Sequence, residues 1–357
     1  MTRRVFTALG LACVLGPLGF LAAAPRANVA AFTTLVPAST LPSKLFDRDF
    51  WQLSTDWSEP NGYFRSDNLT SNELLFQHVI ADLVSRTKPG GVYLGVGPEQ
   101  NYTYMAAVRP AMAVIFDIRR GNLDLQLMYK ALFELANDRA DFVSMLFAKP
   151  RPPGLGAKSS VVEIFSAFSS SPTSDALYNR TLKAIEDQLT RTHGLPLSPQ
   201  DLEGIEYVYH AFYWNGFAVR ANVTYEELMT ATDGAGAYKS YLATEDSFAF
   251  LKRLESKNLV VPVVGDFGGP KAIRAAGEYL KAHGATVTAF YLSNVEQYLS
   301  QDGKSTLFCR NVASLPLDSS STFIRSTNRG GFGGFGRGPG FVSSLGAMAA
   351  EMKNCGV

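Results

Sequence analysis

Apolar and polar residues follow one another along the chain in blocks that predict an α/β fold. A short apolar run at residues 92–96 is followed by a helix-like stretch at 101–108 and a second apolar run at 113–117. Residues 123–136 have strong helical periodicity, and a compact apolar block at 141–148 indicates a third strand. Because strands that alternate with helices usually form a parallel sheet covered on both faces, we expect a Rossmann-like three-layer sandwich with a mostly parallel sheet.

This pattern is interrupted once, which defines the expected domain organisation. We predict a core at residues 71–325, interrupted by a mostly helical insertion at about 151–240. Residues 32–70 are a linker and lead-in, and residues 326–357 are a glycine-rich loop and tail. Around and after the insertion, we expect helices at 71–87, 175–192, 198–217, 244–258 and 270–284, and strands at 259–269, 285–294, 305–315 and 320–327.

The first residues have the pattern of an export signal. Arg3 and Arg4 precede an apolar stretch, and small residues offer cleavage after Ala24 or near Ala31. We therefore predict that residues 1–31 are a signal peptide, which leaves a periplasmic or extracellular protein with no stable membrane span. A single N-terminal membrane anchor is the alternative. The sequence "TRRVF" also partly resembles the twin-arginine export motif, whose pathway carries folded proteins.

Charge and cysteine content narrow the possible partners. The formal net charge of +1 gives no electrostatic reason to expect nucleic acid as a partner. Only Cys309 and Cys355 remain after removal of the signal, so in an oxidising compartment we predict a disulfide between them. The four histidines are scattered and no CxxC motif is present, so we expect no metal site.

Ligand-binding residues are predicted where the first strand meets the following helix. In "YLGVGPE", Gly95 and Gly97 lack side chains, which allows the backbone to approach a ligand. Asp117 ends the next strand, where open α/β sheets use a carboxylate to bind ribose hydroxyls. Glu99 disfavours a dinucleotide phosphate at the helix start and suits an amino or sulfonium cation. We predict a nucleoside site here; the alternative is a structural turn beside a structural aspartate.

At these residues the chain resembles the class I S-adenosylmethionine-dependent methyltransferase superfamily. "YLGVGPE" stands where that family has its first glycine-rich motif, and "IFD" where it has its ribose-binding acid. The resemblance implies that Gly95 and Gly97 line the methionine part of S-adenosylmethionine and that Asp117 holds the ribose. Tyr93 departs from the family, which usually has an acid two positions before the first glycine.

A closer resemblance is to an uncharacterised bacterial exported family with a methyltransferase-like core. The residues that carry it are the blocks "GPEQNYTYMAAVRP", "FDIRRGN", "GDFGGPKAIRA" and "AFYLSNVEQYL". This resemblance implies a fold and gives no substrate. Arg119 and Arg120 follow the ribose-binding position, where a double arginine could bind the 2′-phosphate of NADP. NADP is therefore the alternative cofactor, and a solvated arginine pair at a helix start is the structural alternative.

Further candidate residues lie at the ends of later strands. Asp266 in "VVGDFGGPKA" is a candidate base or substrate-binding acceptor, and the alternative is a cap for the following helix. Ser293 and Asn294 end a strand at the same sheet edge and are expected to face the cleft. Asn294 could equally cap the next helix.

The insertion offers one candidate general base. His210 lies with Tyr207 and Trp214 at spacings of three and four, so the three share one helix face. This pattern suggests an aromatic lid over a substrate with His210 as general base. The alternative is an amphipathic helix that packs on the core.

Three functions remain open at this point. The first is a methyltransferase-like enzyme that uses S-adenosylmethionine on an unknown acceptor and binds a small-molecule or nucleoside ligand. The second is an NADP-dependent oxidoreductase exported with its cofactor. The third is a non-catalytic exported binding protein, favoured because little S-adenosylmethionine is found outside the cytoplasm. The G-x-S-x-G motif of serine hydrolases is absent, which disfavours a hydrolase.

Overall fold

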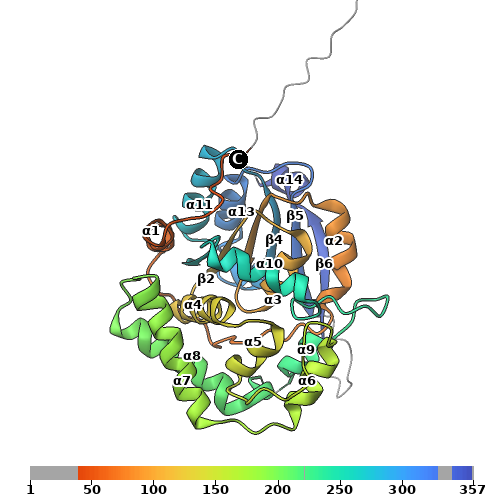
Figure 1. Cartoon of the computed structure of the whole chain (residues 1–357). Coiled ribbons are helices and arrows are strands. Elements are labelled where there is room, and N and C mark those ends of the chain that lie inside the picture. Colours follow the sequence, from red (N-terminus) through yellow and green to blue (C-terminus); the bar gives the residue numbers. More distant parts are fainter. Residues whose placement is uncertain (1–38, 221, 329–339, 356–357) are drawn as a thin grey trace, which may run out of the picture. The chain divides into compact units, whose positions relative to one another are not determined.

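A six-stranded sheet forms the centre of the protein, with helices on both faces (Figure 1). The computed structural model describes residues 39–220, 222–328 and 340–355, so the predicted signal peptide and most of the glycine-rich segment lie outside the described residues. The strands stand in the order β3-β2-β1-β4-β5-β6. The first five are parallel, and β6 is antiparallel to β5. Their bounds are β1 Val92–Val96, β2 Met112–Asp117, β3 Val260–Val264, β4 Val287–Ser293, β5 Thr322–Asn328 and β6 Phe341–Ala347.

Strands β2 and β3 are apolar except for Asp117 at the end of β2, because both of their faces are covered. Every residue of β2 and β3 is buried, and Ile115 and Phe116 of β2 have no exposed surface. Such continuous apolar runs are typical of parallel sheets packed between two helical layers. The α/β class and the Rossmann-like arrangement predicted from the sequence are confirmed.

Helices pack on the sheet in two groups. The first group comprises α2 Ile80–Arg86, α3 Gln100–Val108, α4 Arg120–Leu135 and α10 Glu245–Ser256. In it, α10 contacts α3 and α4, and α2 contacts α3. The second comprises α1 Asp47–Trp57, α11 Ala272–Ala282 and α13 Ser305–Ala313, and α11 contacts the other two helices. Shorter elements are η1 Phe76–Val79, α12 Val295–Gln301, α14 Met348–Glu351 and η4 Met352–Asn354.

The insertion is helical, as predicted, and it packs on the core through α8 and α4. Figure 1 shows its helices together below the sheet, in yellow to green. Three of them begin with a capping box, in which Ser160, Ser198 and Thr224 exchange hydrogen bonds with the acid three residues later. With the preceding α5, its elements are α5 Arg139–Leu146, α6 Val161–Ser169, α7 Asp175–Asp187, η2 Gln188–Thr192, α8 Pro199–Asn215, η3 Gly216–Ala218 and α9 Tyr225–Thr230.

Two predicted strands are helices in the structure. The block at 141–148 belongs to α5, where Asp138 caps the helix by accepting a hydrogen bond from the backbone N–H of Asp141. The block at 305–315 forms α13. Both predictions were wrong because a short buried apolar run has the same composition in a strand and in a helix. The helix predicted at 270–284 begins later than expected, since Pro270 precedes Lys271, the N-cap of α11.

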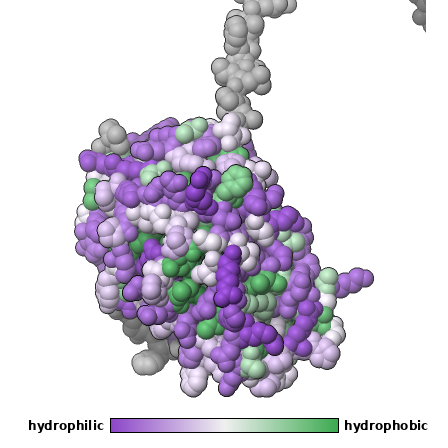
Figure 2. Space-filling view, turned by 60° about the vertical axis from the view of Figure 1, so that its left-hand side comes forward, coloured by the Kyte–Doolittle hydropathy of each residue, from purple (hydrophilic) through white to green (hydrophobic). Residues whose placement is uncertain are grey.

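Strand β6 was also missed, since its sequence was assigned to the C-terminal tail. Among the described residues it pairs with β5 alone, and its residues are mostly half-buried, so the apolar signal is weak. Within the described part of the chain, no helix combines the length and apolar character needed to cross a bilayer. The face in Figure 2 is largely hydrophilic, with small hydrophobic patches near its middle, as expected where most large apolar side chains are inside.

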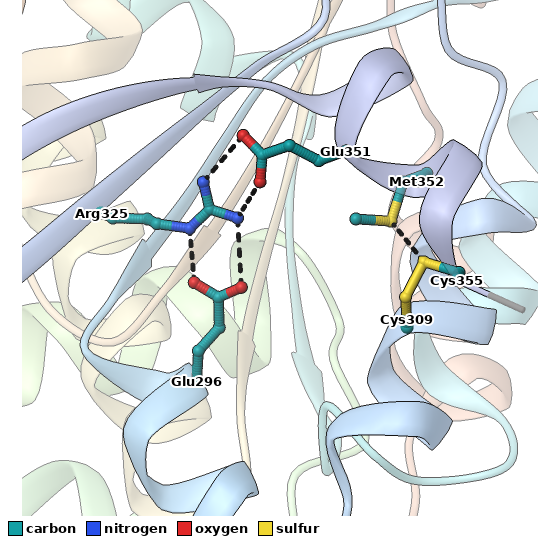
Figure 3. Close-up of a disulfide and its surroundings, with 6 residues drawn as sticks. All are labelled: Glu296, Cys309, Arg325, Glu351, Met352 and Cys355. Atoms are coloured by element: carbon teal, nitrogen blue, oxygen red, sulfur yellow. Dashed lines mark hydrogen bonds and ion pairs between the residues drawn. A yellow bond between two sulfur atoms is a disulfide. The ribbon is translucent and has the colours of Figure 1, made fainter.

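An arginine with two carboxylate partners fixes the C-terminal region (Figure 3). Arg325 on β5 donates to Glu296 of α12 and, at 2.7 Å, to Glu351 of α14. Its guanidinium also lies over the ring of Phe323, 4.2 Å from the ring centroid. A side chain at Gly346 of β6 would collide with both Arg325 and Glu351, so this close approach requires glycine.

The predicted disulfide between Cys309 and Cys355 is present and joins α13 to the segment after η4 (Figure 3). The two cysteines are 46 positions apart in the chain. A link across a loop of this length removes much of the freedom of the unfolded chain. It therefore holds the C-terminal segment, and with it β6, against the body of the protein.

Removing this disulfide is expected to destabilise the fold. The double variant Cys309→Ser/Cys355→Ser should lose about 2–4 kcal/mol of unfolding free energy, measured by urea denaturation. The wild type with the disulfide reduced is the control and should lose a similar amount. Equal stability of the oxidised and reduced wild type would contradict the role assigned to the link.

Candidate functional site

A cavity of about 360 Å³ lies at the carboxyl ends of the parallel strands. The end of β1 contributes Gly97 and the end of β4 contributes Ser293, and these two strands are neighbours in the sheet. The chain runs from β1 to β2 and β3 on one side, and continues to β4 and β5 on the other. The cavity therefore lies at the point where the strand order reverses, which is where open α/β sheets bind their ligands.

The turn after β1 is held in shape by Asn101. Its side-chain amide donates to the backbone carbonyls of Val96 and Pro98 at 2.9 and 2.7 Å, and its oxygen accepts from Tyr93. Gly97 has a φ of +74°, and a side chain there would meet nothing within 4 Å. Since Gly97 also lines the cavity, its missing side chain leaves room for a ligand.

Gly95 has a different role from the one predicted. It does not line the cavity, and a side chain there would collide with the side-chain oxygen of Asn101. Glycine is needed at this position so that Asn101 can pack against the strand. Of the two glycines predicted to contact a cofactor, the structure thus brings only Gly97 to the cavity.

Asp117 lines the cavity, and both of its carboxylate oxygens accept hydrogen bonds from Arg119. The backbone N–H of Arg119 donates to Asp117 at 2.9 Å and its guanidinium at 3.2 Å. Burial raises the pKa of Asp117, and the adjacent arginine opposes this shift. Arg119 is itself buried and does not line the cavity, and Arg120 pairs with Asp201 at 2.7 Å. The structure therefore does not place the two arginines where the 2′-phosphate hypothesis needs them.

Glu99 is fully buried and lies outside the cavity lining. Both of its carboxylate oxygens accept from the backbone N–H of Ser71, at 3.1 and 3.2 Å. Burial raises its pKa to about 7. Its role is to hold the segment before η1 onto α3, so the predicted contact with a ligand cation is not supported.

This buried carboxyl group should make stability depend on pH. Because its pKa of about 7 in the folded state exceeds its ordinary value of 4.5, the folded protein binds the proton more tightly. The contribution of Glu99 to the free energy of unfolding should be greatest below pH 4.5 and should be lost as the pH rises through 7. Glu99→Gln should remove up to about 3 kcal/mol of that loss, measured by urea unfolding across this range. Glu278→Gln, on the exposed face of α11, should follow the wild type.

Asp266 reaches the cavity, but its carboxylate already has partners. One oxygen accepts from the backbone N–H of Gly268 at 2.9 Å, and the other pairs with Lys304 at 2.6 Å. The start of α11 is bound instead by Glu59, which accepts from the backbone N–H groups of Lys271 and Ala272. Asp266 is thus neither the predicted helix cap nor a free base; it and Lys304 form an ion pair in the cavity wall.

The sequence prediction missed the most buried acid of the cavity, Glu73. It is 2% exposed and accepts from Tyr291 at 2.9 Å and from Ser293 at one oxygen, and from Gln100 at 2.8 Å at the other. Burial raises its pKa against these hydrogen bonds. In the sequence "SNELLF", Glu73 follows Ser71 by two positions, and an acid this close to a possible capping residue is typical of a helix start, so it gave no sign of a ligand site.

His210 is not brought to the cavity. It is exposed on α8, where its ring stacks on Trp214 and packs edge-on against Tyr178 and Tyr213. Tyr207 of the same helix donates to Asp67. Neither His210 nor the three aromatic residues that its ring contacts line the cavity, so the general-base role predicted for His210 has no support. Across residues 39–220, 222–328 and 340–355, no group of three or more His, Cys, Asp or Glu side chains could hold a metal ion.

Comparison with known families gives a match over most of the chain. Residues 68–341 match a family described as "Domain of unknown function (DUF7790)". The protein belongs to the DUF7790 family. The matched region includes the whole parallel sheet, the helical insertion and every strand end at the cavity. No curated protein is similar enough to the chain to count as a relative.

Proposed function

We propose that this DUF7790 protein binds a nucleoside-containing ligand in the cavity, and that the ligand is S-adenosylmethionine used for methyl transfer. The observation that carries the proposal is the meeting of Gly97 and Asp117 at the strand-order reversal. A backbone free of side chains and an acid at the end of the next strand are what ribose binding requires in sheets of this order. The cavity volume falls in the range of small-molecule sites.

The lining offers a partner for each part of such a ligand. Asp117 would accept hydrogen bonds from the ribose hydroxyls. Ile118 and Phe267 line the cavity beside it and supply apolar surface for a base. Glu73 lines the cavity and would be the carboxyl partner of a sulfonium or amino group, in place of Glu99. No acceptor of the methyl group is assigned.

The alternative cofactor, NADP, is less well supported. Arg119 and Arg120 suggested it, but each pairs with an aspartate. A non-catalytic binding protein is the second candidate, favoured by the ion pair of Asp266 with Lys304, which leaves no free base at that position. We further propose that the protein is exported, and the disulfide supports an oxidising compartment.

Changing the ribose-binding acid tests the proposal. Asp117→Asn should weaken binding of S-adenosylhomocysteine about ten- to more than a hundred-fold, because a charged acceptor contributes about 1.5–3 kcal/mol. Calorimetric titration would measure this. Asp201→Asn breaks a similar buried aspartate–arginine pair away from the cavity and should leave affinity unchanged. Equal affinity of the wild type and Asp117→Asn would refute the role of Asp117.

A further inference from the structure

The cavity contains a serine whose surroundings resemble those of a catalytic nucleophile. Ser293 ends β4 and is only partly buried, so its hydroxyl is accessible from the cavity. Its φ is +50°, a left-handed conformation that is uncommon for any residue except glycine. A register irregularity between Tyr291 and Ser293 accompanies this conformation. Such strained residues and strand irregularities concentrate at functional sites.

The hydroxyl of Ser293 donates to a carboxyl group that is held in position by other residues. It donates to Glu73, and the hydroxyl of Tyr291 donates to the same oxygen at 2.9 Å. The other oxygen of Glu73 accepts from Gln100, which is fully buried at the start of α3. A nucleophile, a base within hydrogen-bond reach and groups that orient the base are the features by which covalent catalysis is recognised.

Electrostatics in the cavity also suit this chemistry. Burial raises the pKa of Glu73, which makes its carboxylate a stronger proton acceptor. Arg220 lines the same cavity and donates to the backbone carbonyl of Thr70 at 3.0 Å. The positive charge of Arg220 is also felt by Glu99, where it opposes the rise in pKa that burial causes. Since Arg220 lines the cavity, we expect the same charge to stabilise negative charge that develops on a substrate oxygen.

We propose that Ser293 is an acyl-accepting nucleophile with Glu73 as its general base, acting on a small ester or thioester. The Ser293 oxygen attacks the carbonyl carbon while its proton moves to Glu73. The bond to the leaving alcohol or thiol breaks, and the leaving group takes that proton. Water then attacks the acyl-serine and gives its proton to Glu73; as the ester bond breaks, Ser293 takes the proton back and the free acid leaves.

This activity goes beyond nucleoside binding and does not depend on it. It was not visible in the sequence because Ser293 stands between Leu292 and Asn294, without the flanking glycines of G-x-S-x-G. Glu73 lies 220 positions away in the chain, and only the fold brings it to Ser293.

Labelling with a fluorophosphonate, a reagent that reacts with activated serines, tests the inference directly. Intact mass and peptide mapping of the wild type should show one adduct, on Ser293. Ser293→Ala and Ser293→Gly should not be labelled, and the glycine variant also tolerates the positive φ, so circular dichroism should show that it folds. Glu73→Gln should slow labelling about a hundredfold or more at pH 7.5, the lower end of the range that a positioned general base contributes.

A matched control is the pair Ser320 and Asp318, in which a serine hydroxyl donates to a carboxylate at 2.6 Å outside the cavity. Ser320→Ala should be labelled at Ser293 at the wild-type rate. The inference is overturned if the wild type is unlabelled, if another serine carries the adduct, or if Glu73→Gln reacts as fast as the wild type. None of these outcomes involves the nucleoside, so they leave the proposed function to its own test.

Discussion

Gly97→Val should lose measurable binding of S-adenosylhomocysteine, with no heat of binding at millimolar ligand. A side chain at this position would enter open space in the cavity wall, which is the space that the ligand is proposed to occupy. Inserting extra atoms into a close-packed contact costs about 1–3 kcal/mol or more. The valine side chain would also prevent the close approach of the backbone to the ligand that glycine allows. An initially weak complex would fall below detection.

The backbone conformation of Gly97 requires a control. Its φ of +74° strains any other residue, so part of the effect of valine could be a loss of folding. Gly90 has a φ of +82°, open space around it and no place in the cavity lining. Gly90→Val should therefore suffer the same strain and still bind the ligand. Loss of binding in both variants, or in neither, would contradict the assignment of Gly97 to the ligand site.

Arg139→Ala should destabilise the protein by about 3–5 kcal/mol, the range found when one partner of a buried ion pair is removed. Arg139 is 1% exposed, and its Nε donates to Glu245 at 2.7 Å. Its other four donors reach the backbone carbonyls of Leu242, Ala243, Ala157 and Ser159. One guanidinium thus joins the segment before α6 to the start of α10, and its removal leaves these groups without a partner.

Urea unfolding would measure this effect. Arg139→Lys keeps the charge but replaces a planar group of five donors by a point charge, so an intermediate loss is expected. Arg151→Ala removes a partly exposed arginine that pairs with Asp138, and it should cost less than about 1 kcal/mol. A loss for Arg139→Ala no larger than that for Arg151→Ala would show that the buried network does not hold the insertion.

Much of the fold followed from local patterns in the sequence. Strands β1 to β4 were found because their apolar runs are separated by strongly periodic helices such as α4, and these features depend only on neighbouring residues. Gly97 and Asp117 were found for the same reason: a glycine turn and a strand-ending acid occupy fixed places in this type of sheet. The block that forms α5 was misassigned because burial on all sides hides the helical period.

The rest of the site could not be predicted because it depends on contacts between distant residues. Glu73 meets Tyr291 and Ser293 more than 200 positions away, and no local pattern announces that contact. Glu99 had the expected position in the sequence, yet its side chain is fully buried against the backbone of Ser71 and does not line the cavity. A position in a motif thus predicted the turn but not the direction of the side chain.

Titration calorimetry of the wild-type protein with S-adenosylhomocysteine and with NADPH tests the central claim most directly. The account predicts that S-adenosylhomocysteine binds with a stoichiometry of one per chain and that NADPH does not bind. If neither ligand binds at millimolar concentration, the nucleoside proposal fails, and the activity inferred for Ser293 is left to its own test. If only NADPH binds, and Arg119→Ala weakens that binding, the protein is an oxidoreductase and the claim is contradicted.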